Sequence, residues 1–203
     1  MFRSDILSKE SIKFYKFTKT VLKPIFKFWF NPKVYGKENI PMTEEPVLIA
    51  SNHTNFFDPC VSIISTRRVI HFISKKELFE GKMGWFFYKM CCIPVDRSIK
   101  NPEAVDRAIN ILKNNGTVGI FPEGTRNRTK DILLPFKFGA MSMAKKTNAW
   151  VVPVAVKGKF KFRSKDLVIR YGRPFKVDDM TLEEATDKLK NKILDLLDEE
   201  NLT

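Results

Sequence analysis

The residue types that could perform chemistry gather in Ser51–Pro59, a polar stretch that follows the apolar run Val47–Ala50. Within it, His53 and Asp58 are separated by four residues. Imidazole groups titrate near neutral pH, so a histidine here could accept a proton from a hydroxyl group. A neighbouring carboxylate would accept the other ring N–H and stabilise the imidazolium that forms. The pair therefore indicates general-base chemistry or, more simply, a helix-capping Asp58 with a histidine packed against it.

No nucleophile of the chain itself accompanies this pair. The sequence contains no Gly-x-Ser-x-Gly turn of the kind that presents a catalytic serine. We therefore expect the substrate to supply the hydroxyl group that His53 would deprotonate.

A second polar stretch, Ile120–Arg128, overlaps the end of another strand-like run, Thr117–Phe121. It offers a turn glycine, a hydroxyl group and two arginines, which together could cradle a phosphate group. A basic surface turn would have the same composition, so this stretch alone leaves both interpretations open.

The elements that must position these stretches alternate along the chain. Apolar runs predict strands at residues 47–50, 69–74, 91–95, 117–121, 150–156 and 167–171. Helical spacing appears between most of them, and this alternation predicts an α/β domain with a largely parallel sheet flanked by helices. In such sheets the sites lie at the carboxyl ends of strands, where both polar stretches begin.

The segment Ser11–Phe30 alternates lysines with aromatic residues and has almost no acidic residue. Pro24 is expected to start, kink or divide a helix there. This composition is typical of a helix in a membrane interface, whereas a terminal helix packed on its own domain would simply have solvated lysines. The side chains expected to enter the acyl boundary are those of Phe14, Phe17, Val21, Leu22, Phe26 and Trp29.

The net charge of the 203-residue chain is +13 at pH 7, and this excess favours an anionic membrane surface, nucleic acid or an acidic protein as partner. The aromatic residues of the first helix are too continuous for base stacking, so no nucleic acid is expected. Three cysteines and two histidines show no metal-ligand spacing, and no metal site is expected. We expect neither a signal peptide at the charged N-terminus nor a membrane-spanning helix.

Together the two polar stretches closely resemble the signature of the glycerolipid acyltransferase family. That family has an Asn-His-x4-Asp block and a Phe-Pro-Glu-Gly-Thr-Arg block, and both are intact at Asn52–Asp58 and Phe121–Arg126. Ile93–Arg97 and Val151–Ala155 are similar to two further blocks, in the same order. The resemblance extends roughly from Pro46 to Gly172.

The resemblance implies acyl transfer from acyl-CoA or acyl-carrier protein to the sn-2 hydroxyl of 1-acyl-sn-glycerol 3-phosphate (lysophosphatidic acid), giving phosphatidic acid without a metal or cofactor. His53 would be the catalytic base and Asp58 would orient it. Backbone N–H groups near Gly124 are candidate donors to the oxyanion of the intermediate. The residues expected at the substrate, with the basic ones at its phosphate, are Asn52, Arg97, Glu123, Gly124, Thr125, Arg126 and Lys137.

The resemblance also implies an arrangement in two parts. An N-terminal amphipathic helical hairpin with its connector would occupy residues 1–40 and associate with the membrane, and the α/β acyltransferase domain would occupy residues 41–203. The protein would then lie on the cytoplasmic face of the cell membrane, as a peripheral or monotopic protein. Cys91 and Cys92 stand where the family often has a small residue, typically glycine.

Two alternatives remain open from the sequence. The first keeps the chemistry and changes the acceptor to glycerol 3-phosphate or another lysolipid. The second is a basic peripheral protein that binds anionic lipid or nucleic acid without catalysis, which would leave the His53–Asp58 pair unexplained.

Overall fold

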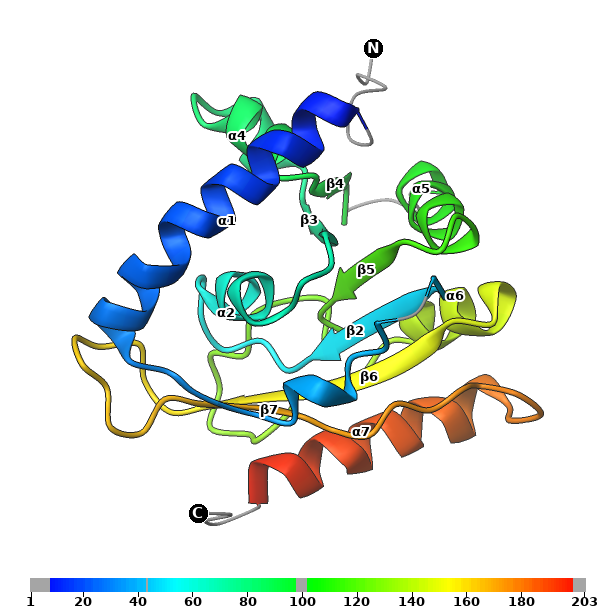
Figure 1. The fold of residues 1–203 in the computed structure, drawn as a ribbon. Helices are drawn as coiled ribbons and strands as arrows, with labels where there is room; N and C mark the ends of the chain where they lie inside the picture. The colour runs from blue at the N-terminus through cyan, green and yellow to red at the C-terminus, as the bar shows by residue number, and fades with distance from the viewer. Residues whose placement is uncertain (1–7, 43, 98–101, 199–203) are drawn as a thin grey trace.

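The computed structural model describes residues 8–42, 44–97 and 102–198. The strands in this part of the chain are β1 (Lys33–Tyr35), β2 (Val47–Ser51), β3 (Ile70–Lys75), β4 (Ile93–Val95), β5 (Thr117–Ile120), β6 (Trp150–Lys157) and β7 (Val168–Tyr171). They form one sheet in the order β1-β7-β6-β2-β5-β3-β4 (Figure 1). The five strands from β6 to β4 are parallel, and β7 and β1 run antiparallel to them. The expected largely parallel α/β sheet is confirmed.

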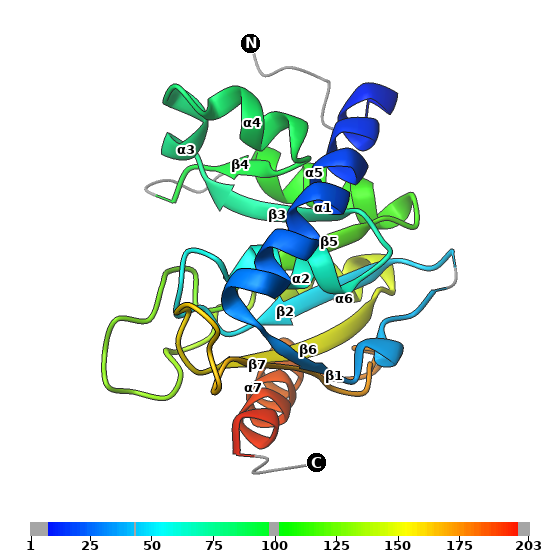
Figure 2. The same ribbon diagram turned by 60° about the vertical axis from the view of Figure 1, so that its left-hand side comes forward.

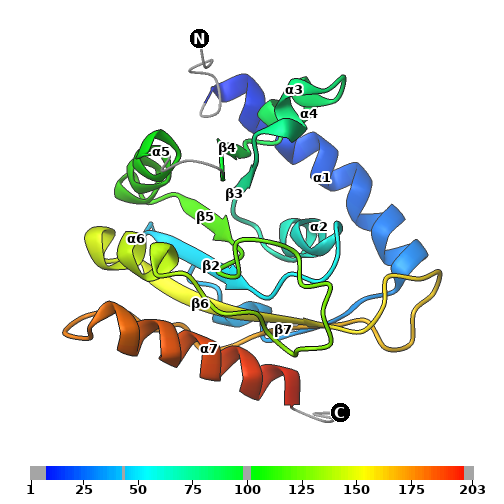
Figure 3. The same ribbon diagram turned by 180° about the vertical axis from the view of Figure 1, so that it is seen from behind.

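Helices cover both faces of this sheet. The helices in the described residues are α1 (Lys9–Phe30), α2 (Asp58–Ser65), α3 (Glu77–Glu80), α4 (Gly84–Lys89), α5 (Pro102–Lys113), α6 (Gly139–Thr147) and α7 (Leu182–Asp198). A 3₁₀ turn, η2 (Lys37–Asn39), follows β1. Helices α1 and α2 lie on one face, and α5, α6 and α7 on the other (Figures 1 and 3).

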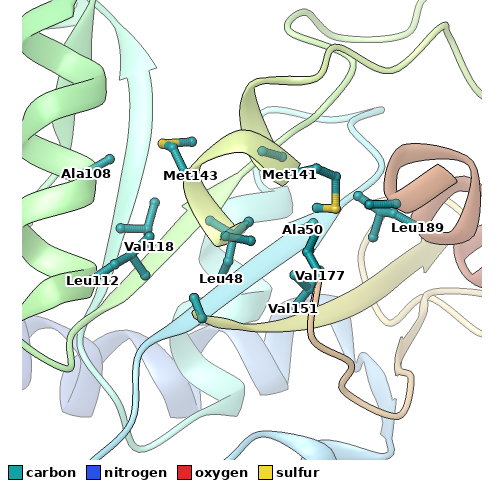
Figure 4. Packing of buried hydrophobic residues seen from close by; sticks show 14 of the residues in the cluster. Leu48, Ala50, Ala108, Leu112, Val118, Met141, Met143, Val151, Val177 and Leu189 are labelled. Atoms are coloured by element: carbon teal, nitrogen blue, oxygen red, sulfur yellow. The ribbon is translucent and has the colours of Figure 1, made fainter. Parts of the chain in front are cut away.

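The alternation of side chains along β2 divides the interior into two cores. Val47 and Ile49 pack with residues of α1 and α2, whereas Leu48 and Ala50 pack with residues of α5, α6 and α7 (Figure 4). All five residues of β2 are buried because helices cover both sides of the strand. A central strand buried on both faces has to be apolar throughout, as the run Val47–Ala50 is.

The N-terminal segment forms one helix over its described residues, where a hairpin of two was expected. Ser8 caps α1 by accepting the N–H of Ser11 at 3.1 Å, and the helix continues through Pro24 to Phe30. Proline removes one helical hydrogen bond and normally breaks an isolated helix. Here Tyr15 and Phe26 are buried against the domain on either side of that point, and this packing keeps the helix in one piece.

The sheet begins before residue 41, where we expected the α/β domain to begin. Strand β1 lies in the connector and pairs with β7, with Lys33 opposite Val168. The segment 75–90, which has the spacing of one helix, divides into α3 and α4. A side chain at Gly84 would lie 2.0 Å from the carbonyl oxygen of Phe79, so this close approach requires glycine. None of the described helices has the length and apolar content needed to cross a membrane.

Candidate active site

The turn between β2 and α2 brings His53 against Asp58. Nδ1 of His53 lies 3.0 Å from Oδ2 of Asp58, and the same oxygen accepts the backbone N–H groups of Thr54 and Asn55, each at 2.7 Å. The Asp58 side chain is fully buried, and the imidazole is 13% exposed. Because a carboxylate only accepts, Nδ1 is the nitrogen that carries the proton. Nε2, which has no hydrogen-bond partner among the described residues, is left to meet a hydroxyl group.

Asp58 does not act as the cap of α2. Phe57 occupies the cap position, and Pro59 lies in the first turn as expected. The Asp58 carboxylate turns back toward Thr54 and Asn55 instead of forward to the N–H groups of its own helix. Its other oxygen, Oδ1, is buried and has no hydrogen-bond partner in the described part of the chain. Oδ2 therefore both shapes the turn and orients the imidazole.

Glu123, in the turn that follows the neighbouring strand β5, holds the backbone of the His53 turn. Its Oε1 accepts the N–H of His53 at 2.7 Å, and its Oε2 accepts the N–H of Leu134 at 2.9 Å. The side chain is buried, and burial raises the pKa of the carboxyl group, an effect that the two N–H donors oppose. We expected Glu123 at the substrate, but both of its oxygens bind backbone.

Asn52 has a similar structural contact. Its side-chain Nδ2 donates to the carbonyl of Val156 at 2.9 Å, and its Oδ1 accepts the N–H of Val156 at 2.8 Å. The amide is buried and extends the pairing of β2 with β6 beyond the ends of the ladder. Asn52 was also expected at the substrate, and the structure gives its side chain a backbone partner.

The turn after β5 brings Lys137 onto Gly124. Gly124 adopts φ +71°, a conformation that favours glycine, and a Cβ there would lie 2.9 Å from Cε and 3.0 Å from Nζ of Lys137, so the lysine side chain lies directly over it. The N–H of Lys137 donates to the carbonyl of Pro122 at 2.9 Å. The N–H of Gly124 donates to the carbonyl of Phe121 at 2.9 Å, so an oxyanion donor on this turn would have to be another of its backbone N–H groups.

The two arginines expected at a phosphate lie in separate loops at the edge of the sheet that holds His53. Thr125 and Arg126 follow β5, Arg97 follows β4, and all three side chains are exposed. One strand, β3, lies between β5 and β4, so these two strands are about 10 Å apart across the sheet.

Two further residues of the site were missed in the sequence. The ring of Phe121 stacks on the imidazole of His53, with centroids 3.9 Å apart and an interplanar angle of 16°. The N–H of Asn127 donates to the carbonyl of His53 at 2.7 Å, and its side chain donates to the carbonyl of Asp131. Asn127 directly follows the Phe121–Arg126 block, and asparagine is common in turns, so its position was a signal that could have been used. Phe121 opens the Phe-Pro-Glu-Gly-Thr-Arg block, but nothing in the sequence indicates that its ring would stack on His53.

The second histidine belongs to the core. His71 is 4% exposed, its Nδ1 donates to the carbonyl of Cys91 at 2.9 Å, and burial lowers its pKa to about 4. Cys91 adopts φ +58°, a left-handed conformation that glycine adopts without strain. Among the described residues, no group of three or more His, Cys, Asp or Glu side chains could hold a metal ion.

Comparison with known proteins places this geometry in context. A family model described as Acyltransferase matches residues 31–157. A 1-acyl-sn-glycerol-3-phosphate acyltransferase of Bacillus subtilis is 38% identical over 148 residues, which cover 71% of each chain. An enzyme of the same name from Borreliella burgdorferi is 33% identical over 142 residues, covering 68% of this chain and 56% of its own.

More distant comparisons agree in fold and differ in length. A chloroplastic 1-acyl-sn-glycerol-3-phosphate acyltransferase of Brassica napus is 32% identical over 145 residues, 66% of this chain but only 42% of its own length. The crystal structure of the 1-acyl-sn-glycerophosphate acyltransferase of Thermotoga maritima superposes with a TM-score of 0.72 at 24% identity. That superposition covers 92% of this chain and 81% of the other, and it shows that the two folds are alike.

Proposed function

The chain belongs to the acyltransferase family, and from that premise we propose that it acylates the sn-2 hydroxyl of 1-acyl-sn-glycerol 3-phosphate to give phosphatidic acid. The observation that carries the proposal is the His53–Asp58 pair within the matched region. Its Nδ1 is bound to a buried carboxylate, and its Nε2 is left to meet a hydroxyl group. The relatives named above, at up to 38% identity, are 1-acyl-sn-glycerol-3-phosphate acyltransferases.

In the proposed reaction, Nε2 of His53 takes the proton of the acceptor hydroxyl as its oxygen attacks the thioester carbonyl carbon. Asp58 stabilises the imidazolium that forms, because its Oδ2 already accepts the Nδ1–H. Collapse of the tetrahedral intermediate breaks the carbon–sulfur bond, and the imidazolium returns the proton to the thiolate that leaves. No protein acyl intermediate is needed, since the acceptor supplies the nucleophile.

For the acceptor's phosphate we propose a basic cradle at the same edge of the sheet. Arg126 and Lys137 lie on the turn after β5, with the Lys137 ammonium over Gly124, and Arg97 reaches from the end of β4. Thr125 adds a hydroxyl group next to Arg126. A guanidinium binds a phosphate with two parallel hydrogen bonds, so arginines in two loops can hold it from two sides.

We further propose that the protein works at a membrane surface on the cytoplasmic side. The exposed apolar side chains that carry this proposal, hereafter the interfacial face, are Phe17, Val21, Ile25, Phe28 and Trp29 of α1 with Phe162 of the β6–β7 loop. Phe28 and Trp29 contact Phe162 with ring centroids 6.2 and 5.1 Å apart, so the two segments form one surface (Figure 2). Lysines surround it on both segments, which suits anionic headgroups.

The side chains of the interfacial face are not all the ones that the sequence predicts would enter the bilayer. Phe14 packs against Trp85 and Phe86, with ring centroids 6.0 and 6.1 Å apart, and Phe26 is only 7% exposed. Phe26 serves the contact of α1 with its own domain, and Phe14 is half-buried against α4. Helical spacing alone does not distinguish the two sides of a helix that is apolar on both.

One assay tests the proposed function and its nearest alternative. Purified protein is incubated with radiolabelled acyl-CoA or acyl-carrier protein and with lysophosphatidic acid, glycerol 3-phosphate or lysophosphatidylcholine. We expect label in phosphatidic acid with the wild type and none with His53→Ala. If a different acceptor gains the label, the proposed acyl-transfer reaction stands and the proposed acceptor is replaced. Absence of transfer from both donors to every acceptor, with a folded protein, would overturn the proposal in favour of a basic lipid-binding protein.

A further inference from the structure

The catalytic turn contacts α1 and the β6–β7 loop through aromatic rings that the proposed mechanism does not use. These rings, hereafter the aromatic cluster, are those of Phe26, Phe30, Phe57 and Phe160. Ring centroids are 5.6 Å apart for Phe26 and Phe57, 5.3 Å for Phe30 and Phe57, and 6.0 Å for Phe57 and Phe160. Phe57 and Phe30 each touch the other three rings, and Phe57 is the member that directly precedes Asp58 in the chain.

The position of Phe57 ties this packing to the His53–Asp58 geometry. Its backbone N–H donates to Oδ1 of Asn55 at 3.1 Å, and the N–H of Asp58 donates to the carbonyl of Asn55. Displacement of the Phe57 ring therefore moves the backbone that places the Asp58 carboxylate. The polar bonds from Glu123 and Asn127 hold the His53 end of the turn, and the Phe57 ring packs against the cluster at its other end.

The three rings that contact Phe57 are themselves held in place by packing and by a backbone hydrogen bond. Phe26 and Phe30 are buried on α1, with ring centroids 4.7 Å apart, and Phe160 contacts Phe30 at 5.4 Å. The β6–β7 loop is joined to the end of α1 by the N–H of Arg163, which donates to the carbonyl of Trp29 at 2.6 Å. The two segments that form the interfacial face are therefore the same two that clamp Phe57 (Figures 1 and 2).

We propose that Phe57 is a positioning residue for acyl transfer: held by Phe26, Phe30 and Phe160, it fixes the distance between Asp58 and His53. This inference rests on the proposed function. It assigns to α1 a part in catalysis that does not require a membrane, since the clamp is formed within the protein. The turnover rate, and not substrate affinity, depends on it.

The test uses Phe57→Ala and Phe57→Leu, with Phe56→Ala as the matched control. Phe56 lies in the same turn and is 50% exposed, and among the described rings it contacts Phe57 alone. With a short-chain, soluble acceptor and no vesicles, we expect Phe57→Ala to lower kcat ten- to a hundredfold, the order that a small misplacement costs. Phe57→Leu should recover part of this loss, and KM should change less than about twofold because binding is not the affected step. Phe56→Ala should behave as the wild type.

A second measurement does not depend on activity. The chain has two histidines, and His71 is 4% exposed, so diethyl pyrocarbonate reports selectively on His53. Peptide mapping should show faster modification of His53 in Phe57→Ala than in the wild type or Phe56→Ala, at a temperature where all three are folded. A double-mutant cycle with Phe30→Ala should show that the combined loss in kcat is smaller than the product of the single losses.

The outcomes separate this inference from the proposed function. If the wild type transfers acyl groups and Phe57→Ala keeps its kcat and its rate of His53 modification, Phe57 is not a positioning residue. A rise in KM at constant kcat would likewise overturn the inference, because Phe57 would then line the acceptor site. If the wild type is inactive toward every acceptor, the proposed function fails while the modification rates still decide whether Phe57 holds the turn.

Discussion

Glu123→Gln tests whether a buried carboxylate holds the catalytic turn through backbone hydrogen bonds. The two side chains have nearly the same shape, but glutamine replaces one acceptor oxygen with an NH₂ group. In the structure each carboxylate oxygen accepts one backbone N–H, from His53 at 2.7 Å and from Leu134 at 2.9 Å. Glutamine can satisfy only one of them, and the other N–H will face a donor.

The expected magnitude follows from these contacts. A buried N–H left without an acceptor costs about 1–3 kcal/mol, and hydrogen bonds to charged groups lie toward the upper end of their range. Burial raises the pKa of the Glu123 carboxyl group, so removing this charge recovers part of the loss. We therefore expect the free energy of unfolding to fall by about 2 kcal/mol. Misplacement of the His53 backbone should lower kcat about tenfold or more.

Urea unfolding and steady-state acyl transfer measure the two effects. Glu123→Asp is the informative second variant, because it keeps the charge but is one methylene too short to reach both donors. Glu183→Gln is the matched control, since Glu183 is exposed in the first turn of α7. If Glu123→Gln retains both the stability and the kcat of the wild type, the hydrogen bonds to Glu123 do not hold the turn. A large rise in the KM of the acceptor, with kcat and stability unchanged, would instead indicate that Glu123 contacts the substrate.

Four further predictions address the base, the phosphate, the membrane and a buried histidine. His53→Ala should lower kcat about 10²–10⁴-fold with an unchanged melting temperature. Arg126→Ala should raise the KM of the acceptor much more than that of the thioester, and Arg126→Lys should restore only part because the bidentate fork is lost. Phe17→Ser combined with Ile25→Ser should weaken sedimentation with anionic vesicles while sparing turnover of soluble acceptors. His71→Asn should remove a stability loss of about 3 kcal/mol that we expect in the wild type between pH 6.5 and about 4.

The sign of the last effect follows from burial. The folded protein keeps His71 neutral, whereas the unfolded chain binds a proton below pH 6.5, so stability declines as the pH falls through this window.

Equal urea midpoints at pH 7 and pH 5 in the wild type would contradict the prediction for His71. Near-native turnover in His53→Ala, equal KM changes in Arg126→Ala, or unchanged sedimentation of the double variant would contradict the other three.

The elements and the reacting pair could be predicted from the sequence because their signals are local. Apolar runs of four to seven residues mark β2, β3 and β6, and His53 and Asp58 are separated by a single turn. The resemblance to a known family then gave the order of the blocks. Local signals fix the type of an element but not the partner of a polar side chain.

Contacts between distant residues account for what the sequence did not show. Glu123 reaches His53 across 70 positions, and Asn52 reaches Val156 across 104, and nothing near either residue indicates a backbone partner. Both residues belong to blocks that the family resemblance associates with the substrate, and a direct contact of either with the substrate stays a prediction. Asp58 looked like a helix cap because it precedes a proline, yet its carboxylate accepts bonds from residues before it.

The two apolar sides of α1 are the feature that connects fold and function most directly. A helix that packs on one domain needs a single apolar side, and Tyr15, Phe26 and Phe30 provide it. Phe17 is 68% exposed and Phe28 is 62% exposed, and their exposure costs solubility unless a second apolar partner covers them. Because the acceptor of the proposed reaction has an acyl chain, a bilayer is the partner that this second side fits. In the proposed arrangement the inner side holds the His53–Asp58 turn through Phe57, so one helix would connect the membrane surface to the proposed base.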